Sequence, residues 1–289
     1  MFAVLAACES GTAREDSPFP APMPTATSAT TEATGADVSS GGMSAESGGS
    51  TSSPTQGSAG ATTSGDPSGD ETAGSAGDTS PGLDLPQQGA TLPEDGRYMM
   101  AGDSITDRGQ LWRSGIVTGL QTAGLAVETV GPYTDAAGHH HAGLDSQQTS
   151  FILQNMPTWL DEHDPNIVNL LIGVNDIRGG VPTDTIASNM TSIVQTIRDA
   201  EPDCFVFVNS VMRYQGSFGG DPNRVPEINA AYVEIVDTFA AQGMSIYWVD
   251  LYSVVPADEI GDGLHPSTDA AGAALMTDVV LGEMLPLVP

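Results

Sequence analysis

The sequence of 289 residues contains no lysine. Its eight positively charged residues are all arginine, whereas Asp and Glu together number 37. The formal net charge is therefore −29. Such a surface repels a phosphate backbone, so we exclude nucleic acids as partners. No uninterrupted apolar run reaches about 18 residues, and we expect no membrane-spanning helix. Two cysteines are too few for a disulfide-stapled scaffold.

Residues 9–92 almost lack large apolar side chains. They consist mainly of Ser, Thr, Gly, Ala and Pro with scattered acids, as in SSGGMSAESGGSTSSPTQGSAG. Such a stretch cannot bury enough surface to offset the entropy lost on ordering it, so we expect a disordered acidic linker. A flexible coil of this length spans about 50 Å.

The first eight residues, MFAVLAAC, differ from this linker. Their end, Leu5-Ala6-Ala7-Cys8, resembles a bacterial lipobox, in which small residues precede a cysteine that is cleaved and acylated. We therefore expect residues 1–8 to be a signal-peptide remnant whose true start lies upstream. With lipidation at Cys8, we expect the protein to be exported, as a lipoprotein of the bacterial cell envelope or as a secreted protein. Its contact with a membrane would be only through this lipid anchor. The alternative is an apolar N-terminus that arises by chance.

Residues 93–289 are long enough for one well-buried domain, which carries a net charge of −19. Short apolar runs alternate in it with longer segments of helical spacing. The predicted strands are 97–101, 127–130, 166–172, 204–211 and 244–251, and the predicted helices are 110–122, 148–162, 184–200, 226–241 and 266–285. This alternation predicts an α/β fold: a three-layer α/β/α sandwich around a five-stranded parallel sheet, as in flavodoxin.

Ligands of parallel sheets bind at the carboxyl ends of the strands, and three strand ends carry reactive side chains here. Ser104 follows the first strand in Gly102-Asp103-Ser104, and Asn175 follows the third in Gly173-Val174-Asn175-Asp176. After the last strand, Asp262-Gly263-Leu264-His265 places a carboxylate where it can orient an imidazole. We expect these side chains to meet at one edge.

The three blocks, in this order and at this wide spacing, resemble the SGNH (GDSL-type) hydrolase family, and the resemblance covers essentially all of 93–289. It implies that Ser104 is the nucleophile, His265 the general base and acid, and Asp262 the residue that orients the imidazole. It also implies an oxyanion hole that includes the backbone N–H of Ser104 and the side-chain amide of Asn175.

One block departs from the family pattern. The family takes a third oxyanion donor from a glycine after the second strand, within a His-x-Gly-x-x-Gly segment in the carbohydrate-esterase branch. An ungapped match to His141-Ala142-Gly143-Leu144-Asp145-Ser146 puts Ser146 at the second glycine. We therefore expect the donor to be either Gly143, in a shifted loop, or the backbone of Ser146.

Each of these residues also has a structural interpretation. Ser104 and Asp262 are typical helix caps, and Asn175 is a typical loop residue that bonds its own backbone. His139-His140-His141 suggests a metal site, but adjacent residues on a loop rarely converge on one ion, which favours a solvated loop. Trp112 has the ring needed to stack on a sugar, although packing in the core is the more common role of such a residue.

Taken together, the sequence predicts an exported serine esterase that needs no metal or cofactor and acts as a monomer. Its expected substrates are small-molecule or polysaccharide esters, because the segment from Gly131 through Gly143 is more similar to carbohydrate deacetylases than to long-chain lipases. Short acyl groups on carbohydrate are the first expectation. A lipase or lysophospholipase is the enzymatic alternative. Two further alternatives are a non-catalytic carbohydrate-binding module and a flavin- or nucleotide-binding protein. The latter would need a phosphate-binding loop after the first strand.

Overall fold

The computed structural model describes residues 90–256 and 260–289. The predicted lipidation site Cys8, the whole of segment 1–8 and nearly all of the predicted linker lie outside the described residues. The described part forms an α/β domain whose two ends meet, since the N–H of Leu92 donates to the carbonyl of Leu287 over 2.7 Å.

A parallel sheet lies at the centre of the domain, and all five predicted strands are confirmed. They are β1 (Asp95–Gly102), β2 (Ala126–Val130), β5 (Ile167–Leu171), β6 (Phe205–Asn209) and β7 (Ile246–Val249). The order β1-β5-β6-β7 continues on the other side of β1 with β2. Every residue of β5 and β6 is buried. Strands covered on both faces need such continuous apolar runs, which is why the sequence reveals them.

A short hairpin adds two strands that the sequence analysis missed. β3 (Tyr133–Thr134) and β4 (His140–Gly143) pair with each other in antiparallel fashion, and β4 also pairs with the last two residues of β1. The sheet therefore has seven strands and is mixed, though mostly parallel. Strands of two and four residues in a His- and Gly-rich segment carry no apolar run or alternation, so pattern reading cannot find them.

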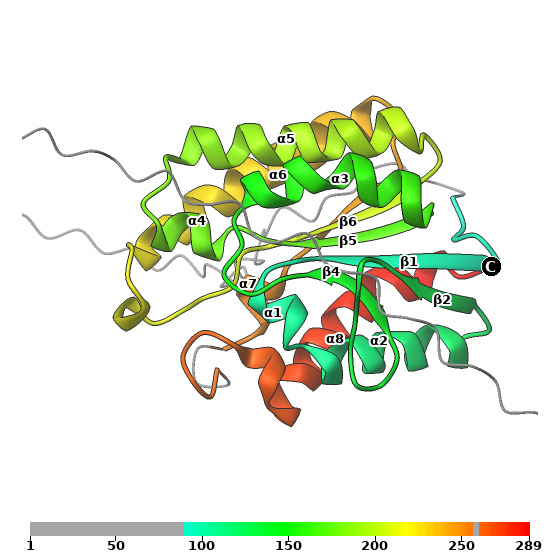
Figure 1. The fold of residues 1–289 in the computed structure, drawn as a ribbon, viewed down its shortest axis with the longest axis horizontal. Helices are drawn as coiled ribbons and strands as arrows, with labels where there is room; N and C mark the ends of the chain where they lie inside the picture. Colours follow the sequence, from blue (N-terminus) through cyan, green and yellow to red (C-terminus); the bar gives the residue numbers. More distant parts are fainter. Residues whose placement is uncertain (1–89, 257–259) are drawn as a thin grey trace, which may run out of the picture. The chain divides into compact units, whose positions relative to one another are not determined.

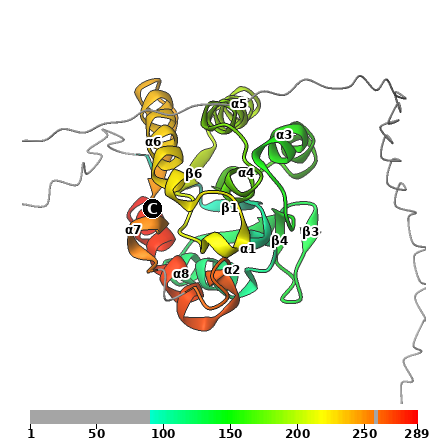
Figure 2. The ribbon, with the colours of Figure 1, turned by 90° about the vertical axis from the view of Figure 1, so that its left-hand side faces the viewer.

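Helices cover both faces of the sheet, which confirms the three-layer sandwich. α2 (Gln110–Thr122) and α8 (Ala270–Met284) pack together on one face, and α3 (Thr149–His163), α5 (Thr183–Ala200) and α6 (Val225–Ala241) lie on the other (Figures 1 and 2). The predicted bounds of α2, α3, α5 and α6 hold to within one residue.

The closing helix begins later than predicted. Pro266–Thr268 forms a 3₁₀ turn, and α8 starts after Asp269, whose carboxylate accepts from the N–H of Gly272 over 2.8 Å. We expected no membrane-spanning helix, because the sequence has no long uninterrupted apolar run. By length and composition alone, however, Ala270–Leu287 is apolar enough to cross a membrane. The segment includes Asp278 and Glu283, and α8 packs on α2 and β7 as part of the domain.

Short helices follow three of the strands at the carboxyl edge. α1 (Ser104–Asp107), α4 (Val174–Arg178) and α7 (Leu251–Val254) follow β1, β5 and β7. The loop after β6 contains two 3₁₀ turns, Gly216–Phe218 and Pro222–Arg224. Figure 2 views the domain from this edge, with α1 and α4 on either side of the end of β1.

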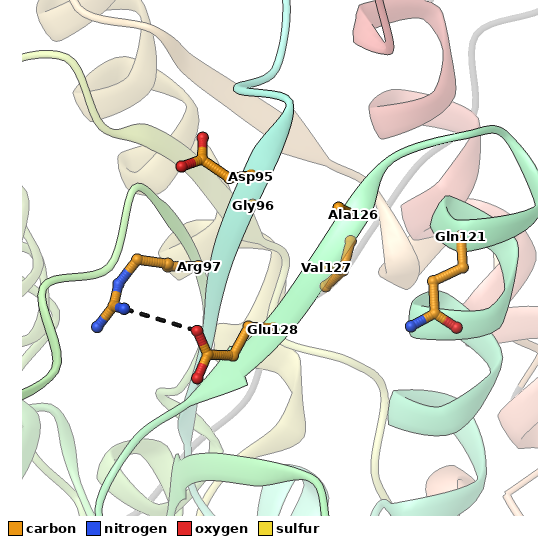
Figure 3. Close-up of a pocket in the computed structure, with 7 residues that line it drawn as sticks. All are labelled: Asp95, Gly96, Arg97, Gln121, Ala126, Val127 and Glu128. Carbon is orange, nitrogen blue, oxygen red and sulfur yellow. Dashed lines mark ion pairs between the residues drawn. The ribbon is translucent and has the colours of Figure 1, made fainter.

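A hollow lies at the opposite edge, between the starts of β1 and β2 and the end of α2 (Figure 3). Two of its charged residues pair with each other, since Arg97 forms an ion pair with Glu128 over 3.6 Å, and Arg97 forms a second ion pair with Asp164 over 3.9 Å. The amino ends of the strands hold none of the predicted site residues.

Candidate active site

The structure brings Ser104 next to His265, which lies 161 positions further along the chain, and His265 next to Asp262. The Oγ of Ser104 lies 2.8 Å from Nε2 of His265, and Nδ1 of the same ring lies 2.7 Å from Oδ2 of Asp262. Ser104 and His265 are buried. Because an ionised carboxylate only accepts, the ring carries its proton on Nδ1, which leaves Nε2 to accept from the Ser104 hydroxyl.

The turn after β1 holds Ser104 in place. The side chain of Asp103 caps α1 by accepting from the N–H of Ile105 over 3.0 Å. Gly102 passes so close to β5 that an added Cβ would lie 2.3 Å from the carbonyl oxygen of Leu171. The cap interpretation of Ser104 is therefore wrong, because Asp103 is the cap and the Ser104 hydroxyl bonds to His265.

Asp262 does not cap the final helix either. Its Oδ1 accepts from the N–H groups of Leu264, over 2.8 Å, and of His265, over 2.6 Å, while Oδ2 faces the imidazole. Burial raises the pKa of Asp262, but the hydrogen bonds from the backbone and ring of His265 and from Leu264 outweigh it, so the pKa lies below its ordinary value. Asp262 is therefore ionised at neutral pH and fixes the ring.

The side chain of Asn175 is held by one residue of another segment and by one residue of its own helix. Its Nδ2 donates to the carbonyl of Gln147 over 2.9 Å, and its Oδ1 accepts from Nη1 of Arg178 over 2.8 Å. Gly173, which precedes α4, has a φ of +129°, a backbone conformation that glycine adopts without strain. The interpretation of Asn175 as a residue bonding its own backbone is therefore wrong.

The two candidates for the third donor differ in their contacts. The N–H of Gly143 points to Nδ1 of His141 over 3.2 Å. Gly143 also lies against α1, where an added Cβ would be 2.7 Å from the N of Asp107, so packing alone accounts for a glycine there. Within residues 90–256 and 260–289, the N–H groups of Ser146 and Ser104 make no hydrogen bond.

Ser146 adopts the backbone conformation that glycine favours, with a φ of +62°. It directly precedes Gln147, whose carbonyl accepts from the Asn175 amide, so Ser146 is the chain neighbour of a residue that contacts Asn175. This agrees with the ungapped match and makes Ser146 the better candidate.

Two buried carboxyls support these loops. Oδ2 of Asp176 accepts from the N–H of Thr149 over 2.9 Å and Oδ1 from its hydroxyl over 2.6 Å, which ties α4 to the start of α3. Burial raises the pKa of Asp103 to about 7 and also raises the pKa of Asp176. With a pKa of about 7, the Asp103 carboxyl carries only part of a negative charge next to Ser104 at neutral pH, which weakens its repulsion of negative charge that develops at the site.

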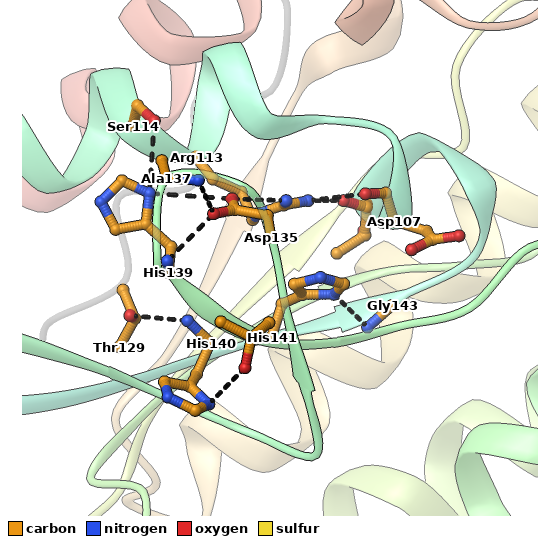
Figure 4. Close-up of polar contacts among 12 residues, drawn as sticks. Asp107, Arg113, Ser114, Thr129, Asp135, Ala137, His139, His140, His141 and Gly143 are labelled. Atoms are coloured by element: carbon orange, nitrogen blue, oxygen red, sulfur yellow. Dashed lines mark hydrogen bonds and ion pairs between the residues drawn. The ribbon is translucent and has the colours of Figure 1, made fainter. Parts of the chain in front are cut away.

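A buried ion pair ties the hairpin to α1 (Figure 4). Arg113, fully buried on α2, forms an ion pair with Asp135 over 2.7 Å, and its guanidinium also donates to the carbonyls of Thr106 and Asp107. Asp135 in turn accepts from the N–H of His139 over 3.0 Å. One side chain thus links the end of α1 to the loop between β3 and β4.

The three adjacent histidines turn to different partners (Figure 4). His139 lies 3.2 Å from the hydroxyl of Ser114, and His140 lies 3.3 Å from the carbonyl of Gly131. His141 is buried, and burial lowers its pKa to about 4, so its ring is neutral at pH 7. The His141 ring contacts the N–H of Gly143, one of the two candidates for the third donor.

Trp112 is a core residue. Its side chain is fully buried and its Nε1 donates to the carbonyl of Ile105 over 3.2 Å. Stacking of this ring on a sugar, which the sequence left open, is therefore excluded.

Sequence analysis missed Arg178 and Arg113. Arg178 lies three positions after Asn175, and on a helix after β5 this spacing brings the two side chains to one face, so the signal was present. Arg113 carried no signal, because its partner Asp135 is in the hairpin that pattern reading cannot find.

Comparisons with known proteins agree with this arrangement. A model of the GDSL-like lipase/acylhydrolase family matches residues 100–273. A protein of Acetivibrio thermocellus named "Putative endoglucanase X" is 29% identical over 119 residues, which are 40% of this chain and 49% of that protein. The chain thus spans about half the length of this relative.

Solved structures share the fold. A family 3 carbohydrate esterase of Clostridium thermocellum superposes with a TM-score of 0.57 at 22% identity, covering 66% of this chain and 98% of that one. A family 3 carbohydrate esterase of Talaromyces cellulolyticus gives 0.57 at 23% identity, covering 66% and 97%. A mutant acetyl esterase crystallised with acetate gives 0.56 at 22% identity, with the same coverage.

Proposed function

Because the chain belongs to the GDSL-like lipase/acylhydrolase family, we propose that it is a serine esterase that hydrolyses short acyl esters, acetyl first, on carbohydrate. The observation that carries the proposal is the continuous chain of hydrogen bonds from Ser104 through His265 to Asp262. This arrangement makes a hydroxyl nucleophilic at neutral pH.

The proposed reaction proceeds through an acyl-enzyme. Oγ of Ser104 attacks the ester carbonyl carbon while its proton passes to Nε2 of His265. The tetrahedral oxygen accepts from the N–H groups of Ser104 and Ser146 and from the Asn175 amide. His265 then gives the proton to the departing alcohol. A water that His265 deprotonates attacks the acyl carbon, which releases the carboxylic acid and restores Ser104.

Two observations support a short acyl group on a water-soluble substrate. Two of the fold neighbours are carbohydrate esterases and a third is an acetyl esterase. Large apolar side chains are exposed in the described residues at only three positions, Leu111, Val254 and Leu285. An enzyme that acts at a lipid surface needs a contiguous apolar patch, and three exposed side chains on three different elements supply little apolar area for one. We therefore place a lipase-type activity second.

A substrate series tests the acyl preference. For the full chain, kcat/KM on p-nitrophenyl acetate should exceed that on the octanoate by about tenfold or more, since a small acyl site excludes added methylenes. Acetate should also be released from acetylated xylo-oligosaccharides. Rates are corrected with Ser104→Ala as the blank. A kcat/KM that rises with acyl length would contradict the short-chain proposal and favour the lipase.

We also propose that the protein is exported and anchored by acyl chains on Cys8. The lipobox-like end at Leu5–Cys8 supports this, and the spacer-like composition of 9–92 suits an enzyme that reaches polymer from a surface. Two acyl chains, at about 0.8 kcal/mol per buried CH₂, hold a protein stably at a membrane. Mass spectrometry should find a diacylated Cys8 at the start of the mature chain, and an unmodified Cys8 in a soluble protein would refute the anchor.

A further inference from the structure

Arg178 contacts the one proposed oxyanion donor that is a side chain. Its Nη1 donates to Oδ1 of Asn175 over 2.8 Å, and both residues lie on α4, three positions apart. On the other side of the amide, Nδ2 donates to the carbonyl of Gln147 over 2.9 Å. Asn175 is buried, so the amide is held between two protein partners.

These two partners require the same orientation of the amide. A guanidinium has donors only, so it must face the amide oxygen. A backbone carbonyl has acceptors only, so it must face the amide nitrogen. Nδ2 carries two hydrogens, and Gln147 takes one of them. The second N–H remains for an oxyanion, whereas a flipped amide would turn its oxygen toward that negative charge.

The charge of Arg178 is directed at neutral oxygen atoms. In residues 90–256 and 260–289 its guanidinium makes no ion pair, and its other hydrogen bond is from Nε to the carbonyl of Phe218 over 2.9 Å. A cationic donor on Oδ1 polarises the amide and makes its N–H a stronger donor. Arg178 therefore acts on both the orientation and the strength of the Asn175 amide.

The loop after β6 fixes Arg178 in turn. The guanidinium lies 5.8 Å from the centre of the Phe218 ring. Gly220, with a φ of +72°, passes so close that an added Cβ would lie 2.6 Å from the Cα of Arg178. The same loop also contacts the segment between Asp262 and His265, since the N–H of Gln215 donates to the carbonyl of Gly263 over 2.8 Å. A shift of this loop would move Arg178 together with the amide.

We propose that Arg178 is a positioning residue of the esterase, which orients and polarises the Asn175 amide so that its free N–H faces the oxyanion. The proposal rests on the proposed function and deepens it. It predicts that Arg178 contributes to turnover only through Asn175, without contact to the substrate.

A double-mutant cycle in the full chain tests this dependence. With p-nitrophenyl acetate, Arg178→Met should lower kcat by about 10- to 100-fold, somewhat less than the 10²–10³ typical of removing an oxyanion donor outright. KM should change by less than about threefold, because the interaction is made in the transition state. In the Asn175→Ala background, the same Arg178→Met should lower kcat by no more than about twofold.

Arg224→Met is the matched control. Arg224 anchors the same loop through the carbonyl of Val181, over 2.6 Å, and the hydroxyl of Thr183, over 3.2 Å, but does not contact Asn175. It should leave kcat within about threefold of wild type, since surface changes away from a site have small effects. A loss equal to that of Arg178→Met would mean that anchoring the loop is the cause, and would overturn the proposal.

If Arg178→Met lowered kcat by the same factor in the wild-type and Asn175→Ala backgrounds, that result would also overturn the proposal. If Arg178→Met does not fold, Arg178→Lys, which keeps a cationic donor, replaces it. Its kcat should lie between those of wild type and Asn175→Ala, and a kcat at or below that of Asn175→Ala would contradict the proposal. Failure of the proposed function is a separate outcome, because it is shown by activity that persists in Ser104→Ala.

Discussion

Ser104→Ala should lower kcat on p-nitrophenyl acetate by about 10⁴-fold or more while the protein stays folded. The loss is large because, in the described residues, Ser104 is the hydroxyl that donates to Nε2 of His265, and removing any member of such a catalytic unit costs nearly the whole rate. The residual rate above that in water comes from the remaining oxyanion donors.

The fold should tolerate this change. Asp103, not Ser104, caps α1, and alanine is a good helix former. Losing one hydrogen bond to His265 costs about 1 kcal/mol. Urea unfolding should therefore give a free energy within about 2 kcal/mol of wild type. A variant that is folded and retains a tenth of the wild-type kcat would contradict the assignment of Ser104 as nucleophile.

Arg113→Met should be the most destabilising of the substitutions considered, costing about 3–5 kcal/mol in the free energy of unfolding. It leaves Asp135 with a charge in a site where only 6% of its side chain is exposed, and it removes the donors to the carbonyls of Thr106 and Asp107. Since a domain has about 5–15 kcal/mol in all, the loss is measurable by urea unfolding.

The double variant Arg113→Met/Asp135→Leu separates the two causes. It removes the unpaired charge, so it should recover part of the stability that Arg113→Met loses, although the two carbonyls stay unpaired. A single variant within about 1 kcal/mol of wild type would show that the pair does not hold the hairpin.

The pair also sets a direction of pH dependence. Burial raises the pKa of Asp135, but the hydrogen bonds from Arg113 and from the N–H groups of His139 and Ala137 outweigh it, and the pKa lies below its ordinary value. A carboxyl whose pKa is lowered by folding stabilises the protein above its unfolded pKa, near 4, and this contribution is lost as pH falls through the folded pKa.

The regular part of the fold follows from the sequence. Strands such as Ile167–Leu171 are continuous apolar runs, and the buried face of α5, formed by Ile186, Met190, Ile193, Val194 and Ile197, follows the helical period. The hairpin does not follow, because strands of two and four residues carry no apolar run, and the ion pair of Arg113 with Asp135 beside it forms only in the folded chain. The start of α8 was placed too early because Pro266 begins a 3₁₀ turn and Asp269 is the cap.

The candidate site follows the same division. Ser104, Asn175 and the Asp262–His265 pair were found because each follows a strand, and parallel strands end at one edge. The donor after β2 was left open between Gly143 and Ser146, since a backbone N–H leaves no trace in side-chain identity. The contacts favour Ser146, because His141 engages the N–H of Gly143, and the choice stays a prediction. The chemical roles of these residues, and the predictions for Cys8 and for 9–92, stay predictions.

Covalent trapping tests the central claim most directly. Incubating the full chain with a fluorophosphonate that mimics the tetrahedral ester should add one phosphonyl group per molecule, on the tryptic peptide that contains Ser104. The same treatment of Ser104→Ala should add none. A wild-type protein that stays unlabelled while it hydrolyses esters, or a label on another residue, would contradict an acyl-enzyme at Ser104.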